Sequence, residues 1–80
     1  MTFLFTSTVI WDNEKCIYNV YQFNLTPGRY KALLVSPRHG NHIKQVVFWK
    51  ADNDWASSLI SKHDGYLVEV LGKEIDQFNK

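Results

Sequence analysis

The chain has 80 residues, of which 45% are hydrophobic, 15% aromatic and 21% charged, and its formal net charge is +1 at pH 7. A chain this short supports one core, so residues 1–80 are expected to form a single domain, and the composition is unlike that of disordered segments. One cysteine excludes an intramolecular disulfide, and no export signal or membrane-length apolar run is recognisable, so we expect a cytoplasmic protein with no membrane partner.

Alternating apolar and polar residues, rich in β-branched and aromatic side chains, predict strands through the first 50 positions. The expected strands cover residues 3–11, 15–25, 29–36 and 43–50. Turn residues separate them: Asp12-Asn13-Glu14, then Pro27-Gly28 at the centre of a type II turn, then Gly40-Asn41 within residues 37–42.

The pattern changes after Lys50. Asp52-Asn53-Asp54 offers N-cap oxygens, and apolar residues then recur at helical spacing, which predicts one short helix at 53–62. Residues 66–72 read as a last strand, and the tail 73–80 either adds a helical turn or frays. The expected fold class is α+β: a small antiparallel sheet in the order β-β-β-β-α-β, with one short helix packed on one face.

Tight pairing across the Pro27-Gly28 and Gly40-Asn41 turns predicts which side chains share a face. The expected core face carries Tyr21, Phe23, Leu25, Tyr30, Ala32, Leu34, Val47 and Trp49. The opposite side, here called the predicted basic face, carries Tyr18, Val20, Gln22, Asn24, Arg29, Lys31, Leu33, Val35, Lys44, Val46, Phe48 and Lys50. A register slip by an odd number of residues would break this assignment, because neighbouring side chains point to opposite faces.

Charge is strongly polarised along the chain. Residues 15–51 hold six basic residues and no acidic one, whereas all eight acids lie outside that stretch. Polarisation of this kind concerns partners more than fold. We therefore expect a non-enzymatic module that binds an anionic partner, either nucleic acid or the acidic surface of a protein that handles it. Its candidate cations are Arg29, Lys31, Arg38, Lys44 and Lys50, and its candidate stacking rings are Phe48 and Tyr18.

Two other interpretations compete with this one. The lysines can simply keep sheet edges soluble. Alternatively, the apolar centre of the same face is a protein interface, formed by Leu33, Val35, Val46 and Phe48. The size and organisation of the chain are similar in broad outline to small phage-encoded inhibitors of host enzymes, which favours an inhibitor or adaptor. Homodimerisation through this face or an exposed strand edge belongs to the same class.

Catalytic and metal sites have weaker support. His39 and His42 are three positions apart, and Cys16 and His63 complete a notional four-ligand zinc site, but exposed loop histidines are the simpler interpretation. His63-Asp64 lacks a correctly placed nucleophile and an oxyanion hole. We expect no enzymatic activity, no cofactor, no metal and no small-molecule substrate.

Overall fold

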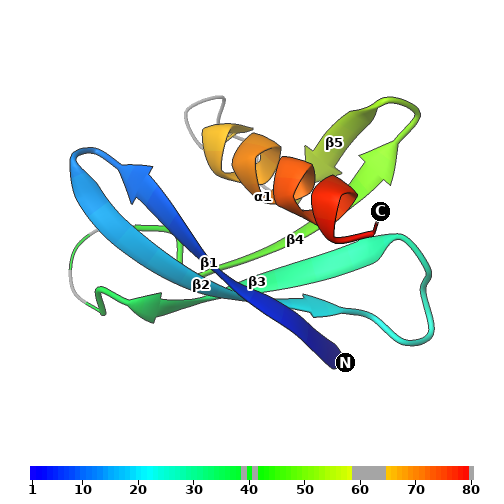
Figure 1. Cartoon of the computed structure of the whole chain (residues 1–80), viewed down its shortest axis with the longest axis horizontal. Helices are drawn as coiled ribbons and strands as arrows, with labels where there is room; N and C mark the ends of the chain where they lie inside the picture. The colour runs from blue at the N-terminus through cyan, green and yellow to red at the C-terminus, as the bar shows by residue number, and fades with distance from the viewer. Residues whose placement is uncertain (39, 41, 59–64, 80) are drawn as a thin grey trace.

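The structure is a computed structural model that describes residues 1–38, 40, 42–58 and 65–79. Five antiparallel strands form one sheet in the order β1-β2-β3-β4-β5, and one helix follows them. The elements are β1 (Thr2–Trp11), β2 (Glu14–Gln22), β3 (Arg29–Ser36), β4 (Gln45–Ala51), β5 (Asp54–Ser57) and α1 (Gly65–Phe78). Helix α1 lies over one side of the sheet (Figure 1), which confirms the α+β fold class with a helix on one face.

Two hairpins close through two-residue turns. Trp11 pairs with Glu14, and the intervening Asp12 and Asn13 have φ of 52° and 61°. Positive φ at both central residues is the requirement of a type I′ turn, and Asp and Asn tolerate it best after glycine. The β4–β5 hairpin also closes through two residues, because Ala51 pairs with Asp54, but here only the first of them, Asp52, has positive φ, at 57°, which is the pattern of a type II′ turn.

The predicted helix at 53–62 is wrong where the structure describes it. Residues 54–57 form β5, and positions 59–62 of that prediction lie outside the described residues. The misread residues are Asp52 and Asn53. Their side chains suit an N-cap and a tight turn equally well, and here they form the turn that sends β5 back along β4.

The strand predicted at 66–72 is also wrong, because these residues lie inside α1. Within seven residues, alternating apolar side chains resemble a strand. Over the full fourteen residues the buried positions are Leu67, Val68, Leu71, Gly72 and Ile75, the stripe of one helical face. The helical alternative for the tail was therefore correct, but the helix begins much earlier than residue 73. The last two elements of the predicted order are exchanged.

The register between strands also differs from the prediction. The Pro27-Gly28 turn is present: the Arg29 amide donates to the Thr26 carbonyl at 3.2 Å, and Gly28 has φ of 80°, as the third position of a type II turn requires. Beyond it, however, Gln22 pairs with Tyr30, and the strand β2 ends before Phe23. The shift from the predicted pairing is odd, and the same is true between β3 and β4.

Because both pairings are shifted by an odd number of residues, the side chains of β2 and β4 lie on the opposite side of the sheet from the predicted one, whereas those of β3 do not. The core face of β3 is as predicted, with Tyr30 and Ala32 buried, but its neighbours bury the opposite set: Cys16, Tyr18 and Val20 on β2, and Val46 and Phe48 on β4. Placing Tyr18, Val46 and Phe48 on an open face was therefore wrong, since their exposed fractions are 0%, 2% and 0%. These three side chains are therefore inaccessible to a partner that binds the folded chain.

Candidate binding face of the sheet

The side of the sheet opposite α1 is not covered by any described element (Figure 1). We call it the open face. Cross-strand pairing and alternation place on it Phe3, Thr6, Thr8, Ile10, Lys15, Ile17, Asn19, Tyr21, Arg29, Lys31, Leu33, Gln45, Val47 and Trp49. Half of these side chains are half-buried by their neighbours and the other half are exposed, Ile10 to 56%. A partner would therefore meet aromatic, aliphatic and basic groups.

Cross-strand pairing arranges these side chains in rows. Arg29 lies opposite Trp49, and its guanidinium carbon is 5.0 Å from the centre of the indole ring. In the next row Lys31 lies between Tyr21 and Val47. Each cation of β3 thus has an aromatic residue beside it, Trp49 for Arg29 and Tyr21 for Lys31. This places positive charge next to rings on which a planar group can stack.

On β1 to β4 the open face carries positive charge without compensating acids. Its positions on β1 to β4 include Lys15, Arg29 and Lys31 but no aspartate or glutamate. The acids that the structure describes lie in the two tight turns, at the first residues of β2 and β5, and on α1: Asp12 and Asp52, then Glu14 and Asp54, then Glu69, Glu74 and Asp76. Neither Arg29 nor Lys31 forms an ion pair with a described residue. Basic and acidic residues are separated along the sequence, and the fold keeps them apart. The open face on β1 to β4 carries basic residues and no acid.

Only part of the predicted site comes together here. Arg29, Lys31 and Leu33 share the open face, while Val35 lies at an irregularity in β3 with 37% exposure. Lys50 lies on the helix side, where its ammonium group is 3.0 Å from an Asp76 oxygen and 5.7 Å from the Trp55 ring centre. Arg38 and Lys44 are exposed in the connection between β3 and β4. The binding roles of these residues stay predictions.

Sequence reasoning missed Tyr21 and Trp49, which it assigned to the core. The signal that identifies Tyr21 is the relative polarity of the two faces of β2. On β2, Cys16, Tyr18 and Val20 form a more apolar set than Lys15, Ile17, Asn19 and Tyr21. On β2 the more apolar set is the buried one, whereas on β4 the two sets are similar in polarity and do not decide the face.

No protein-family model matches this chain, and comparisons with curated proteins and solved structures give no significant match. Among the described residues, no helix is long and apolar enough to cross a membrane.

A second cluster lies on the helix side, around Cys16. Its sulfur is 3.5 Å from Nδ1 of His42, and Nε2 of His42 is 3.5 Å from a Glu14 carboxylate oxygen. Trp11 packs beside the imidazole, with 5.9 Å between ring centres. The expectation of an exposed loop histidine is wrong for His42, whose side chain is 13% exposed; His39 and His63 lie outside the described residues.

This arrangement resembles a nucleophile, a base and an orienting acid, but its thiol is inaccessible. Cys16 is 0% exposed, and burial raises its pKa above the ordinary 9.0, with a further upward contribution from the Glu14 and Asp12 carboxylates. An activated cysteine needs the opposite shift and an open approach. Within the described residues, no three potential ligands are grouped to hold a metal ion.

The raised pKa of Cys16 makes stability depend on alkaline pH. Well below pH 9.0 the thiol is protonated in both states. Above it the unfolded chain ionises first, so the free energy of unfolding should fall as pH rises. Urea unfolding from about pH 8 to about pH 10.5 should show a steeper decline for the natural protein than for Cys16→Ala. Equal slopes for the natural protein and Cys16→Ala would contradict the buried environment assigned to the Cys16 thiol.

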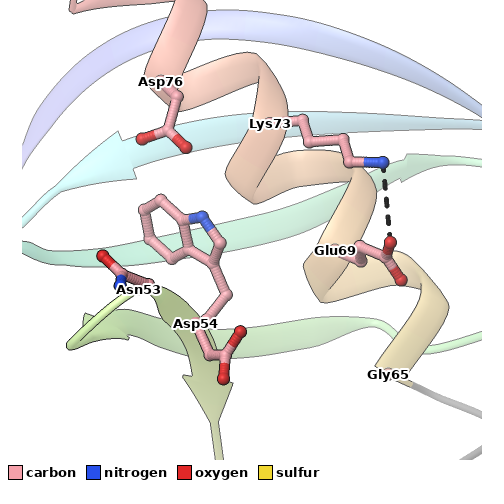
Figure 2. A pocket seen from close by; sticks show the side chains of 7 residues that line it. Asn53, Asp54, Gly65, Glu69, Lys73 and Asp76 are labelled. Carbon is pink, nitrogen blue, oxygen red and sulfur yellow. Dashed lines mark ion pairs between the residues drawn. The ribbon is translucent and has the colours of Figure 1, made fainter.

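A cleft of about 680 Å³ separates the β4–β5 hairpin from α1 and is lined by Asn53, Asp54, Trp55, Gly65, Glu69, Lys73 and Asp76 (Figure 2). Its carboxylates are largely compensated by the protein itself. Glu69 lies 3.5 Å from the Lys73 ammonium, and Asp76 is paired with Lys50. We therefore assign the cleft no ligand, and the open face is the better candidate.

Proposed function

We propose that this protein is a non-enzymatic module that binds single-stranded nucleic acid on the open face. The observation that carries the proposal is the pairing of each β3 cation with a neighbouring aromatic residue: Arg29 with Trp49, and Lys31 with Tyr21. Cations attract the phosphates, while rings stack on bases of any identity. The absence of acids on the β1 to β4 positions of this face removes the main source of repulsion.

A single strand fits this surface better than a duplex does. Bases in a duplex are stacked on one another and leave only their edges accessible, whereas an unpaired base can lie flat on an aromatic side chain. The groove of a duplex admits a helix or a two-stranded ribbon. A broad sheet face with half-buried rings supports the stacking mode instead.

The proposal predicts that oligonucleotide binding depends on salt and on two named cations. Binding of a short fluorescent single-stranded oligonucleotide should weaken steeply with salt. Reversing both charges in Arg29→Glu, Lys31→Glu should remove binding at moderate salt, because two attractive phosphate contacts become repulsive. If the double variant retains weak binding, the slope of log K against log salt should be smaller by about 1.4.

The matched control is the double variant Lys50→Glu, Lys73→Glu. It changes the net charge by the same amount, but both positions lie on the helix side of the molecule. Once circular dichroism shows that it is folded, it should keep most of the affinity. Equal losses in both double variants would mean that net charge, not the open face, determines binding, and no binding by the natural protein at low salt would end the proposal.

A protein partner is the second candidate, because exposed aliphatic side chains lie near the same surface. Ile10 is 56% exposed and Val35 is 37% exposed. Leu33 lies on the same face as Lys31, two residues further along β3. That partner would be an enzyme that this chain inhibits, or a protein that this chain binds as an adaptor. Arg29 and Lys31 would attract an acidic rim on the partner during association. In that case Leu33→Asp should abolish binding of the protein partner, and the natural protein should bind no oligonucleotide. The single cysteine supports a cytoplasmic setting for either partner.

A further inference from the structure

We propose that two copies of this chain associate through the free edge of β1, which joins their sheets into one. The sheet has two edge strands, β1 and β5, and among the described residues β1 pairs only with β2. Along residues 6–10 its outer edge therefore presents backbone amides and carbonyls that no described strand pairs, which are a template for another strand. This proposal does not depend on the proposed nucleic-acid binding.

The edge of β1 lacks the usual protection against pairing. Natural edge strands are kept short, or carry lysine, proline or a bulge that discourages a neighbouring chain. β1 has ten residues, Thr2–Trp11, without a charged residue or a proline. Its one irregularity lies between Phe3 and Phe5, which leaves residues 6–10 as a regular stretch. The opposite edge strand, β5, has only four residues and begins with Asp54.

A groove that contains two phenylalanine rings lies beside the same edge. Phe5 of β1 and Phe78 at the end of α1 pack with 5.4 Å between ring centres, and Phe78 is nevertheless 51% exposed. Together with Thr6, Glu74 and Gln77 they line a shallow groove of about 380 Å³. A strand added to β1 would lie against this groove and cover it, so backbone pairing and apolar burial favour the same position.

A second copy is the occupant that these residues favour. Two identical strands that pair about a two-fold axis bring their charges close together, so an edge with charges of one sign repels its own copy. The uncharged β1 has no such penalty, and its hydroxyl-bearing residues Thr6 and Thr8 are of a kind that pairs well across strands. Association through a two-fold axis perpendicular to the sheet keeps both helices on one side and makes the open faces continuous.

Sedimentation equilibrium on the full chain tests this proposal. The natural protein should sediment with twice its chain mass of 9.4 kDa. The double variant Thr8→Lys, Ile10→Lys adds charge to the pairing stretch, and it should raise the dimer dissociation constant about tenfold or more. The control Leu33→Lys, Gln45→Lys adds the same charge to the open face, away from β1, and should leave the dimer intact.

Amide hydrogen exchange on the natural protein gives a second measurement that does not depend on the variants folding. Those β1 amides that point away from β2 should be protected at concentrations where the dimer forms and exchange rapidly on dilution. A chain that stays monomeric up to about 1 mM would overturn the proposal. So would a dimer that survives the β1 variant and dissociates in the open-face control, or a dimer whose outward β1 amides stay unprotected.

Discussion

Phe48→Ala should lower the free energy of unfolding by about 3 to 5 kcal/mol, the usual cost of removing a fully buried phenylalanine. Phe48 is 0% exposed and packs between Tyr30 and Trp55, with ring centres 5.8 and 5.7 Å away. Truncation leaves a cavity between these large rings, which cannot collapse without moving the β4–β5 hairpin. For a domain of 80 residues this is a large part of the total stability.

Urea denaturation followed by tryptophan fluorescence measures the loss, and Phe3→Ala is the matched control. Phe3 is 51% exposed on the open face and contacts Tyr21 edge-on at 5.6 Å. The same truncation there should cost about 1 kcal/mol or less, since little apolar surface is removed from the interior. Equal losses for Phe3→Ala and Phe48→Ala would contradict the assignment of the two faces.

Gly72→Ala should also destabilise the fold, by about 1 to 3 kcal/mol, although alanine normally favours a helix over glycine. Gly72 is buried on α1, and an added methyl group would overlap the indole of Trp55. Trp55 is itself held by Tyr30 and Phe48, so the ring cannot simply move aside. The absence of a side chain at Gly72 is what lets α1 approach the β4–β5 hairpin closely.

Gly65→Ala is the control for this effect. It lies at the start of the same helix, and an added methyl group there meets no atom within 4 Å. Thermal unfolding should show a lower Tm for Gly72→Ala and an unchanged or slightly higher Tm for Gly65→Ala, because the helix propensity gain then acts alone. A stabilised Gly72→Ala would mean that α1 does not pack on Trp55 as the structure has it.

The first four strands follow from the sequence because their signals are local. Alternation along each strand and the Asp12-Asn13 and Pro27-Gly28 turns need no distant partner to be read. The exchange of helix and strand after Lys50 shows the limit of short windows. Asp52-Asn53 serves a turn as well as a cap, and residues 66–72 alternate like a strand until Ile75 extends the helical stripe.

The candidate site was less predictable than the strands, because it depends on register. Residues 23–25 lie between the end of β2 at Gln22 and the turn at Pro27-Gly28, and this connection shifts the pairing by an odd number of residues. That shift moves Tyr18 into the core and brings Tyr21 to the open face, and the separate odd shift between β3 and β4 does the same for Phe48 and Trp49. Arg29 and Lys31 stay where the sequence placed them, since β3 itself was assigned correctly.

We propose that the open face, and not the helix side, receives a nucleic-acid strand. Nuclear magnetic resonance titration of the labelled chain with a short single-stranded oligonucleotide at low salt tests it most directly. We expect shifts to concentrate at Arg29, Lys31, Tyr21 and the Trp49 indole, with α1 resonances nearly unchanged. Shifts centred on α1 and Lys50, or no shifts at all, would contradict it.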